Sequence, residues 1–116
     1  MAYLFVYGTL KRGLCRHHFL KGQHFVAPAK TRPHYRLFNV GEYPGMVRAA
    51  DGLSIEGELW SVDDESLKQI DREEGCNTGL YHRKAIDLAP PHDAIAVEAY
   101  LYQRSTQGLV DCGCRW

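Results

Sequence analysis

One segment of the 116-residue chain, Asp64–Glu74, has the pattern of an amphipathic helix, and this scarcity of helix constrains the fold more than any other feature. Asp63 or Asp64 can cap its N-terminus, acidic residues fill its first turn, and Gly75 can end it. Elsewhere the chain offers short apolar stretches broken by glycine and proline, which are typical of strands and turns. The sequence therefore predicts a fold made mostly of strands.

The first predicted strand runs from Ala2 to Tyr7, and both of its alternating faces are apolar. This pattern favours a central strand that is covered on both sides. Further strands are predicted at Phe25–Val47 (several irregular strands with a turn at Glu42–Gly45), Ser54–Val62 (with Gly57 where another group approaches closely), Leu80–Leu88 and Ala94–Gln103.

Length and charge narrow the classes of function. A chain of 116 residues fits a single domain, which we expect to span residues 1–116. Fourteen Lys and Arg balance fourteen Asp and Glu, so the charge footprint of a nucleic-acid-binding protein is missing and a small partner is expected. Nothing before Tyr3 resembles the charged and apolar regions of a signal peptide, so we expect none, and no apolar run reaches the roughly 20 residues of a membrane span. We expect a cytoplasmic protein without a membrane partner.

A glycine-bounded loop follows the first strand. Gly8 and Gly13 enclose Thr9-Leu10-Lys11-Arg12 and allow backbone angles that other residues resist, so consecutive N–H groups can converge on one point. Such a loop suits an anion or an oxyanion. A nucleotide-binding P-loop is not expected, because Leu14-Cys15 stand where that motif needs Lys and Ser or Thr.

Glu74 is the candidate for acid–base chemistry. At helical spacing it lies on the same stripe as Leu67 and Ile70, whereas Glu73 falls outside that stripe. A carboxylate that faces an apolar interior has its pKa raised by desolvation, which makes it a usable general base. The alternative is that Glu74 lies at a frayed helix end or forms a structural pair with Arg83.

Three segments in this order resemble the gamma-glutamylcyclotransferase superfamily, especially its small gamma-glutamylamine cyclotransferase-like branch: Phe5–Gly13, Ile55–Trp60, and Ile70–Gly75 followed by Tyr81–Arg83. The resemblance covers nearly the whole chain. It implies an α+β fold, a small mixed β-barrel with one or two short helices, and a cavity in which the first loop faces a catalytic glutamate.

The resemblance also implies roles for particular residues. Glu74 matches the family's proton acceptor, which serves as general acid and base. The residues that match its substrate-binding positions are Tyr7, Gly8, Thr9 and Leu10, in the substrate-cradling motif, and Tyr81, an aromatic residue near the cavity.

The implied reaction is attack of the substrate's own α-amine on its γ-glutamyl carbonyl, which releases an amine and leaves 5-oxoproline. It implies a small γ-glutamyl substrate and no metal or cofactor. A non-catalytic small-ligand binding or regulatory domain with the same pocket is the alternative, and an acyl-processing role on a γ-glutamylated intermediate is a third reading.

The remaining candidates are interpreted as structural. A zinc site of Cys112 and Cys114 with Cys15 and His17-His18 has unusual spacing, so we expect free thiols and a flexible C-terminal tail. The basic residues Lys11, Arg12, Arg16 and Lys21 are expected in a solvated loop and short helix, with binding of an anionic substrate or partner as the alternative. Tyr43, Tyr100 and Tyr102 are expected in the core or at its rim, with contact between one of them and the substrate as the alternative.

Overall fold

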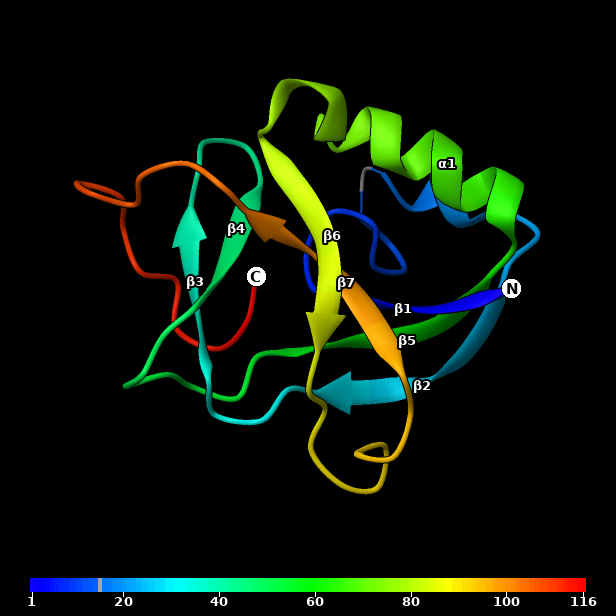
Figure 1. Cartoon of the computed structure of the whole chain (residues 1–116), viewed down its shortest axis with the longest axis horizontal. Helices are drawn as coiled ribbons and strands as arrows, with labels where there is room; N and C mark the ends of the chain where they lie inside the picture. Colours follow the sequence, from blue (N-terminus) through cyan, green and yellow to red (C-terminus); the bar gives the residue numbers. More distant parts are fainter. Residues whose placement is uncertain (15) are drawn as a thin grey trace.

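A computed structural model describes residues 1–14 and 16–116, and these residues form seven strands, one α-helix and two 3-10 helices (Figure 1). The expected small mixed α+β fold is confirmed, although its sheet does not close into the expected barrel. In chain order the elements are β1 (Ala2–Val6), η1 (His17–Leu20), β2 (His24–Lys30), β3 (Tyr35–Asn39), β4 (Pro44–Arg48), β5 (Glu56–Val62), α1 (Asp64–Glu73), η2 (Cys76–Thr78), β6 (Tyr81–Ile86) and β7 (Val97–Tyr102).

The strands form one mixed sheet in the order β2-β5-β1-β7-β4-β3, with β6 paired to β7, and this order does not close into a ring. Because β6 pairs with β7 over its whole length, β1 and β4 share the opposite edge of β7. Parallel β1 pairs with Val97 and Glu98, and parallel β4 pairs with Leu101. Ala99 and Tyr100 lie between these two pairings. The sheet therefore divides at β7 into one arm of β1, β5 and β2 and another of β4 and β3.

Strand β1 separates two apolar cores, as its two apolar faces predicted. Leu4 and Val6 pack in the core that also holds Leu67 and Ile70 of α1. Phe5 belongs to the other core, with residues of β3, β4 and β7. Figure 1 shows α1 lying along one side of the sheet. The helix thus carries its C-terminal end to the place where the sheet divides.

The ends of α1 follow the predicted signals. The Asp63 carboxylate accepts a hydrogen bond from the Ser66 N–H (2.7 Å), so Asp63 is the N-cap. The helix ends at Glu73, one residue before the predicted end, and Glu74 is its C-cap. Gly75 follows in the left-handed conformation (φ 72°) that favours glycine.

Several predicted boundaries in the sheet are wrong. The turn predicted at Glu42–Gly45 ends earlier, because Pro44 and Gly45 are the first residues of β4. Proline is tolerated at the first position of a strand, and a Cβ at Gly45 would lie 2.8 Å from Cβ of Tyr102. Strands β5 and β7 also begin two and three residues later than predicted.

The predicted close approach of another group at Gly57 is confirmed. A Cβ there would lie 2.4 Å from the main-chain oxygen of Val6, so β1 and β5 can pack closely only with glycine at this position.

The C-terminal segment is not the predicted tail. The Cys112 N–H donates to the Leu37 carbonyl and the Glu56 N–H donates to the Cys114 carbonyl, each at 2.7 Å. Trp116 packs against the core that contains Phe5. Backbone hydrogen bonds, which the terminal sequence alone does not indicate, thus connect both arms of the sheet through this segment.

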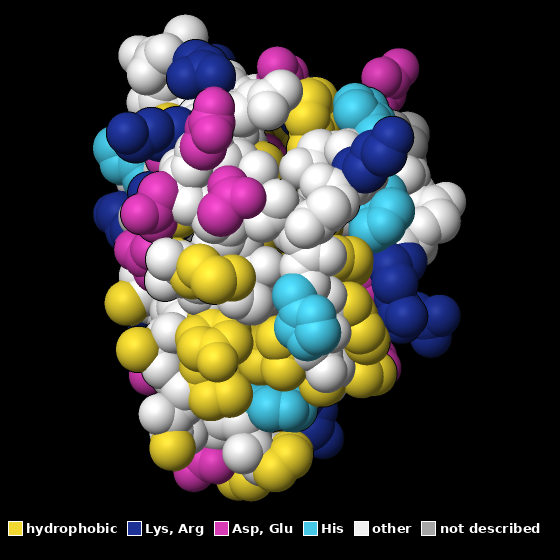
Figure 2. All heavy atoms as spheres, turned by 90° about the vertical axis from the view of Figure 1, so that its right-hand side faces the viewer, with side chains coloured by type: hydrophobic (Ala, Val, Ile, Leu, Met, Phe, Trp, Pro, Cys, Tyr) yellow, Lys and Arg dark blue, Asp and Glu magenta, His cyan; other side chains and the backbone are white. Residues whose placement is uncertain are grey.

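The surface carries both signs of charge. On the face shown in Figure 2, acidic and basic side chains are interspersed beside a region where apolar side chains gather. Within the part of the chain that the structure describes, the helices are all too short or too polar to cross a membrane.

Candidate active site

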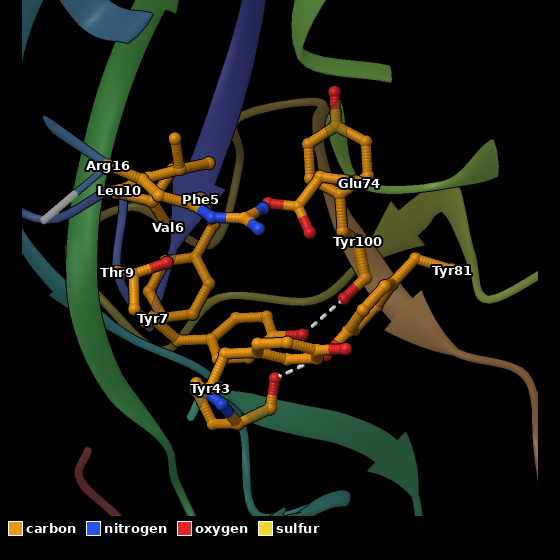
Figure 3. Close-up of a pocket in the computed structure, with 12 residues that line it drawn as sticks. Phe5, Val6, Tyr7, Thr9, Leu10, Arg16, Tyr43, Glu74, Tyr81 and Tyr100 are labelled. Carbon is orange, nitrogen blue, oxygen red and sulfur yellow. Dashed lines mark hydrogen bonds between the residues drawn. The ribbon is translucent and has the colours of Figure 1, made fainter. Parts of the chain in front are cut away.

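A narrow pocket opens where β1 and β4 part along β7 (Figure 3). Its floor consists of buried, mostly aromatic side chains, and its rim of half-buried residues. The floor residues are Phe5, Val6, Tyr7, Leu10, Pro44, Tyr81 and Tyr100, and the rim residues are Gly8, Thr9, Arg16, Tyr43 and Glu74. All six residues predicted for the site therefore line one pocket.

Tyr7 holds the two arms together below the pocket. Its hydroxyl donates to the main-chain oxygen of Tyr100 and accepts from the N–H of Met46 (3.2 Å). The hydroxyl therefore binds β7 at Tyr100, between the residues of β7 that pair with β1 and the residue that pairs with β4. Because burial raises the pKa of Tyr7, the hydroxyl stays protonated. The Tyr7 ring therefore remains as the part that a ligand can contact.

Tyr81 supports the opposite wall. Its hydroxyl donates to the Pro44 carbonyl (2.6 Å), and its ring lies against Tyr43, with ring centroids 6.2 Å apart. Burial raises the pKa of Tyr81, so this hydroxyl too stays a donor. Tyr81 thus fixes the start of β4 against the pocket and presents an aromatic face to it.

The loop after β1 provides unpaired amides. The Gly8 and Thr9 carbonyls accept hydrogen bonds from the N–H groups of Lys11 (3.0 Å) and Arg16 (2.9 Å), which fold the loop back on itself. The N–H groups of Gly8, Thr9 and Leu10 donate to no residue in the described ranges 1–14 and 16–116. Among the described residues, three successive amides beside the pocket are thus unpaired, as the binding of an anion or an oxyanion requires.

One of the two glycines of this loop, Gly8, differs from the prediction. Gly13 has the left-handed backbone (φ 80°) that was expected, but Gly8 does not. Gly8 is needed for space instead, because a Cβ there would lie 2.7 Å from Cγ of Pro44. Close packing of the loop after β1 against the start of β4 imposes this requirement, which the loop sequence does not reveal.

Glu74 directs its carboxylate into the pocket from the end of α1 (Figure 3). Burial raises its pKa from 4.5 to about 7; the positive charge of Arg16 opposes this shift and the negative charge of Glu73 adds to it. Glu73 itself is exposed. The predicted difference between the two adjacent glutamates is confirmed. At a pKa near neutrality, Glu74 can both accept and return a proton.

The alternative pairing of Glu74 with Arg83 is not found. Arg83 donates two hydrogen bonds to the Asp71 carboxylate (2.9 and 3.1 Å) and one to Glu98 (2.6 Å). The Tyr100 hydroxyl also donates to Asp71 (2.6 Å). We call Asp71, Arg83, Glu98 and Tyr100 the Asp71 cluster. Arg83 is therefore bound to Asp71 and Glu98, and its charge is not paired with Glu74.

The sequence interpretation favoured other roles for three residues that line the pocket. Arg16 was interpreted as part of a solvated basic run, and Tyr43 and Tyr100 as core or rim aromatics, but all three line the pocket. The hydrogen bond from the Arg16 N–H to Thr9 brings Arg16 back to the rim, and spacing alone gives no sign of this contact.

The proposed zinc alternative can be examined for most of its residues. Within residues 1–14 and 16–116, no group of three or more His, Cys, Asp or Glu side chains is placed to hold a metal ion. Cys76, Cys112 and Cys114 are free thiols. Cys15, which was part of that alternative and of the free-thiol prediction, lies outside the described residues.

Known proteins resemble this chain in sequence and in fold. A family model described as "Gamma-glutamyl cyclotransferase, AIG2-like" matches residues 4–116. The human protein named gamma-glutamylaminecyclotransferase is 36% identical, in a match that covers 91% of this chain and 80% of that protein.

Two solved structures have the same fold. A uropathogenic E. coli-specific protein, 28% identical, superimposes with a TM-score of 0.86 over 99% of this chain and 91% of its own. An AIG2-like protein from Mus musculus, 27% identical, gives a TM-score of 0.74 over 91% of this chain and 78% of its own. With the match over residues 4–116, these likenesses show that the chain belongs to the AIG2-like gamma-glutamyl cyclotransferase family.

Proposed function

We propose that this protein converts a γ-glutamyl amine, or a related small γ-glutamyl compound, to 5-oxoproline and a free amine, with Glu74 as general acid and base. The family and the names of the relatives support gamma-glutamylcyclotransferase activity. The observation that carries the finer proposal is the Glu74 carboxylate, which faces the pocket and whose pKa burial raises to about 7.

The reaction begins with a proton transfer. The substrate's α-ammonium has no lone pair, so the Glu74 carboxylate first accepts one of its protons. The freed amine nitrogen forms a bond with the γ-carbonyl carbon, whose π electrons move to the oxygen, and this gives a five-membered tetrahedral intermediate. When the carbonyl re-forms, the bond from that carbon to the leaving nitrogen breaks and the proton on Glu74 passes to the leaving nitrogen. The ring nitrogen gives up its second proton through the Glu74 carboxylate to the released amine, which departs as an ammonium and leaves the lactam. No electron is gained or lost, and the carboxylate is regenerated.

The loop amides would act on the oxygen atoms of the substrate. The N–H groups of Gly8, Thr9 and Leu10 can bind the α-carboxylate or the oxyanion that develops on the γ-carbonyl. The attacking and attacked atoms belong to one molecule, so a pocket that holds the folded conformer gains most of its rate enhancement from orientation.

The aromatic floor of the pocket would shape the site and exclude water from it. The rings of Tyr7, Tyr81 and Tyr100 are buried, and their hydroxyls are used in hydrogen bonds within the protein. They can therefore pack on the methylene groups of the γ-glutamyl chain without competing for the reacting proton.

The proposal includes a single catalytic domain over residues 1–116 that works in the cytoplasm. The pocket takes residues from Phe5 to Tyr100, which supports one folding and catalytic unit. The free thiols of Cys76, Cys112 and Cys114 suit a reducing compartment.

The test is a substrate panel. The protein is incubated with γ-glutamyl amines, γ-glutamyl amino acids and an isopeptide, and 5-oxoproline is measured by mass spectrometry, with the Glu74→Gln variant as control. We expect the wild-type protein to form 5-oxoproline from at least one γ-glutamyl amine, and Glu74→Gln to form it at least about 100-fold more slowly. Binding of these compounds without any 5-oxoproline would contradict the proposal and favour a non-catalytic binding domain.

A further inference from the structure

Two opposite charges face each other at the pocket. Of the residues from the described ranges that line it, Arg16 and Glu74 are the two with charged side chains, and both are half-buried at the rim. Figure 3 shows the Arg16 guanidinium extending toward the Glu74 carboxylate. Opposite charges in a partly desolvated site attract a ligand that carries both signs.

Contacts on two elements hold Arg16 in this position. Its main-chain N–H donates to the Thr9 carbonyl (2.9 Å), and its Nη1 donates to the Glu73 carbonyl (3.2 Å) at the end of α1. The guanidinium also lies 5.7 Å from the centroid of the Tyr43 ring. Arg16 therefore connects the loop after β1 with the helix that carries Glu74.

The guanidinium retains binding capacity. An arginine has five N–H donors, and the hydrogen bond to Glu73 uses one of them among the described residues. Its neighbours in the basic run are engaged elsewhere: Lys11 Nζ donates to the main-chain oxygen of Trp116, and Arg12 pairs with Glu58. Lys21, the fourth basic residue of this run, is exposed and does not line the pocket. Within this run, Arg16 is thus the cation available to an anionic group in the pocket.

We propose that Arg16 binds the α-carboxylate of the γ-glutamyl group and thereby restricts the substrates to γ-glutamyl compounds whose α-carboxylate is free. This inference rests on the proposed function. The α-carboxylate and the α-ammonium share one carbon atom, so a carboxylate held by Arg16 brings the ammonium toward Glu74. The amides of Gly8, Thr9 and Leu10 are then left for the γ-carbonyl oxygen, which separates two tasks that the loop could otherwise perform.

Calorimetric titration with 5-oxoproline, the product that keeps this carboxylate, tests the role of Arg16. We expect Arg16→Gln to weaken 5-oxoproline binding by about 10- to 100-fold, the usual effect of losing a charge-assisted hydrogen-bonded pair. Arg16→Lys, which keeps the charge without the planar fork, should fall between. Arg72→Gln is the matched control, because Arg72 is an exposed arginine on the last turn of α1 outside the pocket, and should bind as the wild type does.

A second measurement needs no variant. A γ-glutamyl alkylamine on which the wild-type protein forms 5-oxoproline is compared with the same compound whose α-carboxylate is converted to a primary amide. We expect kcat/KM to fall at least about tenfold for the amide. Equal values for the two compounds overturn the inference.

The outcomes separate this inference from the proposed function. If the wild-type protein forms 5-oxoproline but folded Arg16→Gln binds it with unchanged affinity, the role of Arg16 is wrong and the proposed function stands. If the wild-type protein neither forms nor binds 5-oxoproline, the proposed function fails and the inference fails with it.

Discussion

Asp71 and Glu74 lie one helical turn apart, and the protein treats their carboxylates in opposite ways. Asp71 accepts two hydrogen bonds from Arg83 and one from Tyr100. Glu74 faces the pocket, and burial together with the charges of Arg16 and Glu73 determines its pKa. One carboxylate fastens α1 to β6 and β7, and the other remains free to exchange a proton.

The difference shows that the partners of a carboxylate, more than its burial, decide its use. A paired carboxylate contributes to stability only while its partners remain, and it has no freedom to react. A desolvated carboxylate without such partners costs stability when ionised, but its pKa then suits proton transfer near neutral pH. Tyr100 connects the two regions, because its hydroxyl binds Asp71 and it lines the pocket.

The largest expected effect is on turnover. Glu74→Gln keeps the shape of the side chain and removes the base, so we expect kcat to fall by roughly 10² to 10⁴ with the fold intact. Glu73→Gln, on the exposed neighbour, should change kcat by less than about twofold. Stopped assays of 5-oxoproline formation measure both variants. Equal losses would remove the distinction between the two glutamates.

Loss of Asp71 should act on stability instead. Asp71→Ala leaves Arg83 with Glu98 alone and removes the acceptor of the Tyr100 hydroxyl, so we expect a loss of about 2–3 kcal/mol in the free energy of unfolding. Urea unfolding measures this change. Because the cluster does not carry the proton, kcat of the folded variant should stay within about threefold of wild type. A folded Asp71→Ala protein as inactive as Glu74→Gln would contradict the comparison.

Ionisation of the Glu74 carboxylate should lower the free energy of unfolding as the pH rises. Burial raises the pKa of folded Glu74 from 4.5 to about 7, so the folded protein binds the Glu74 proton more tightly than the unfolded chain does. Stability from this group is therefore present at low pH and is lost as pH rises from about 4.5 to 7. We expect Glu74→Gln to be more stable than wild type by about 1–2 kcal/mol at pH 8, with the difference shrinking toward pH 4.5. A variant less stable than wild type at pH 8 would show that Glu74 has a structural partner.

The smallest expected effects concern the glycines of the loop. Gly8→Ala places a Cβ 2.7 Å from Pro44 Cγ, and Gly13→Ala strains a backbone with φ 80° that has nothing within 4 Å. Each should cost about 1 kcal/mol of stability. Titration with 5-oxoproline should separate them, because Gly8→Ala moves the amides at the pocket and should weaken binding roughly threefold to tenfold. Equal affinities in the two variants would place the binding amides elsewhere.

The sequence predicted the parts of the site that depend on local patterns. The helical stripe through Leu67 and Ile70 distinguished Glu74 from Glu73, and capping residues located both ends of α1 within one residue. The two apolar faces of the first strand predicted its position between two cores. Local periodicity and capping chemistry are enough for such features.

Features that depend on distant contacts were not predictable. Arg16 reaches the rim through a hydrogen bond to Thr9, and Gly8 is required because Pro44 lies against it. Tyr7 bridges β7 and β4 through its hydroxyl, a contact set by how the sheet divides. In each case the sequence contains the residue, but the fold determines its neighbour.

The pH dependence of kcat/KM for 5-oxoproline formation tests the central claim, that Glu74 accepts the substrate's proton with a pKa near neutrality. Burial keeps Tyr7, Tyr81 and Tyr100 protonated by raising the pKa of each, so among the titratable groups at the pocket Glu74 should set the acid limb. With Glu74 ionised in the active form, kcat/KM should rise with pH to a plateau with a midpoint of about 7, and fall about tenfold per pH unit below it. The residual activity of Glu74→Gln should lack this limb. A wild-type profile that stays flat down to pH 5, or the same limb in the variant, would contradict the account.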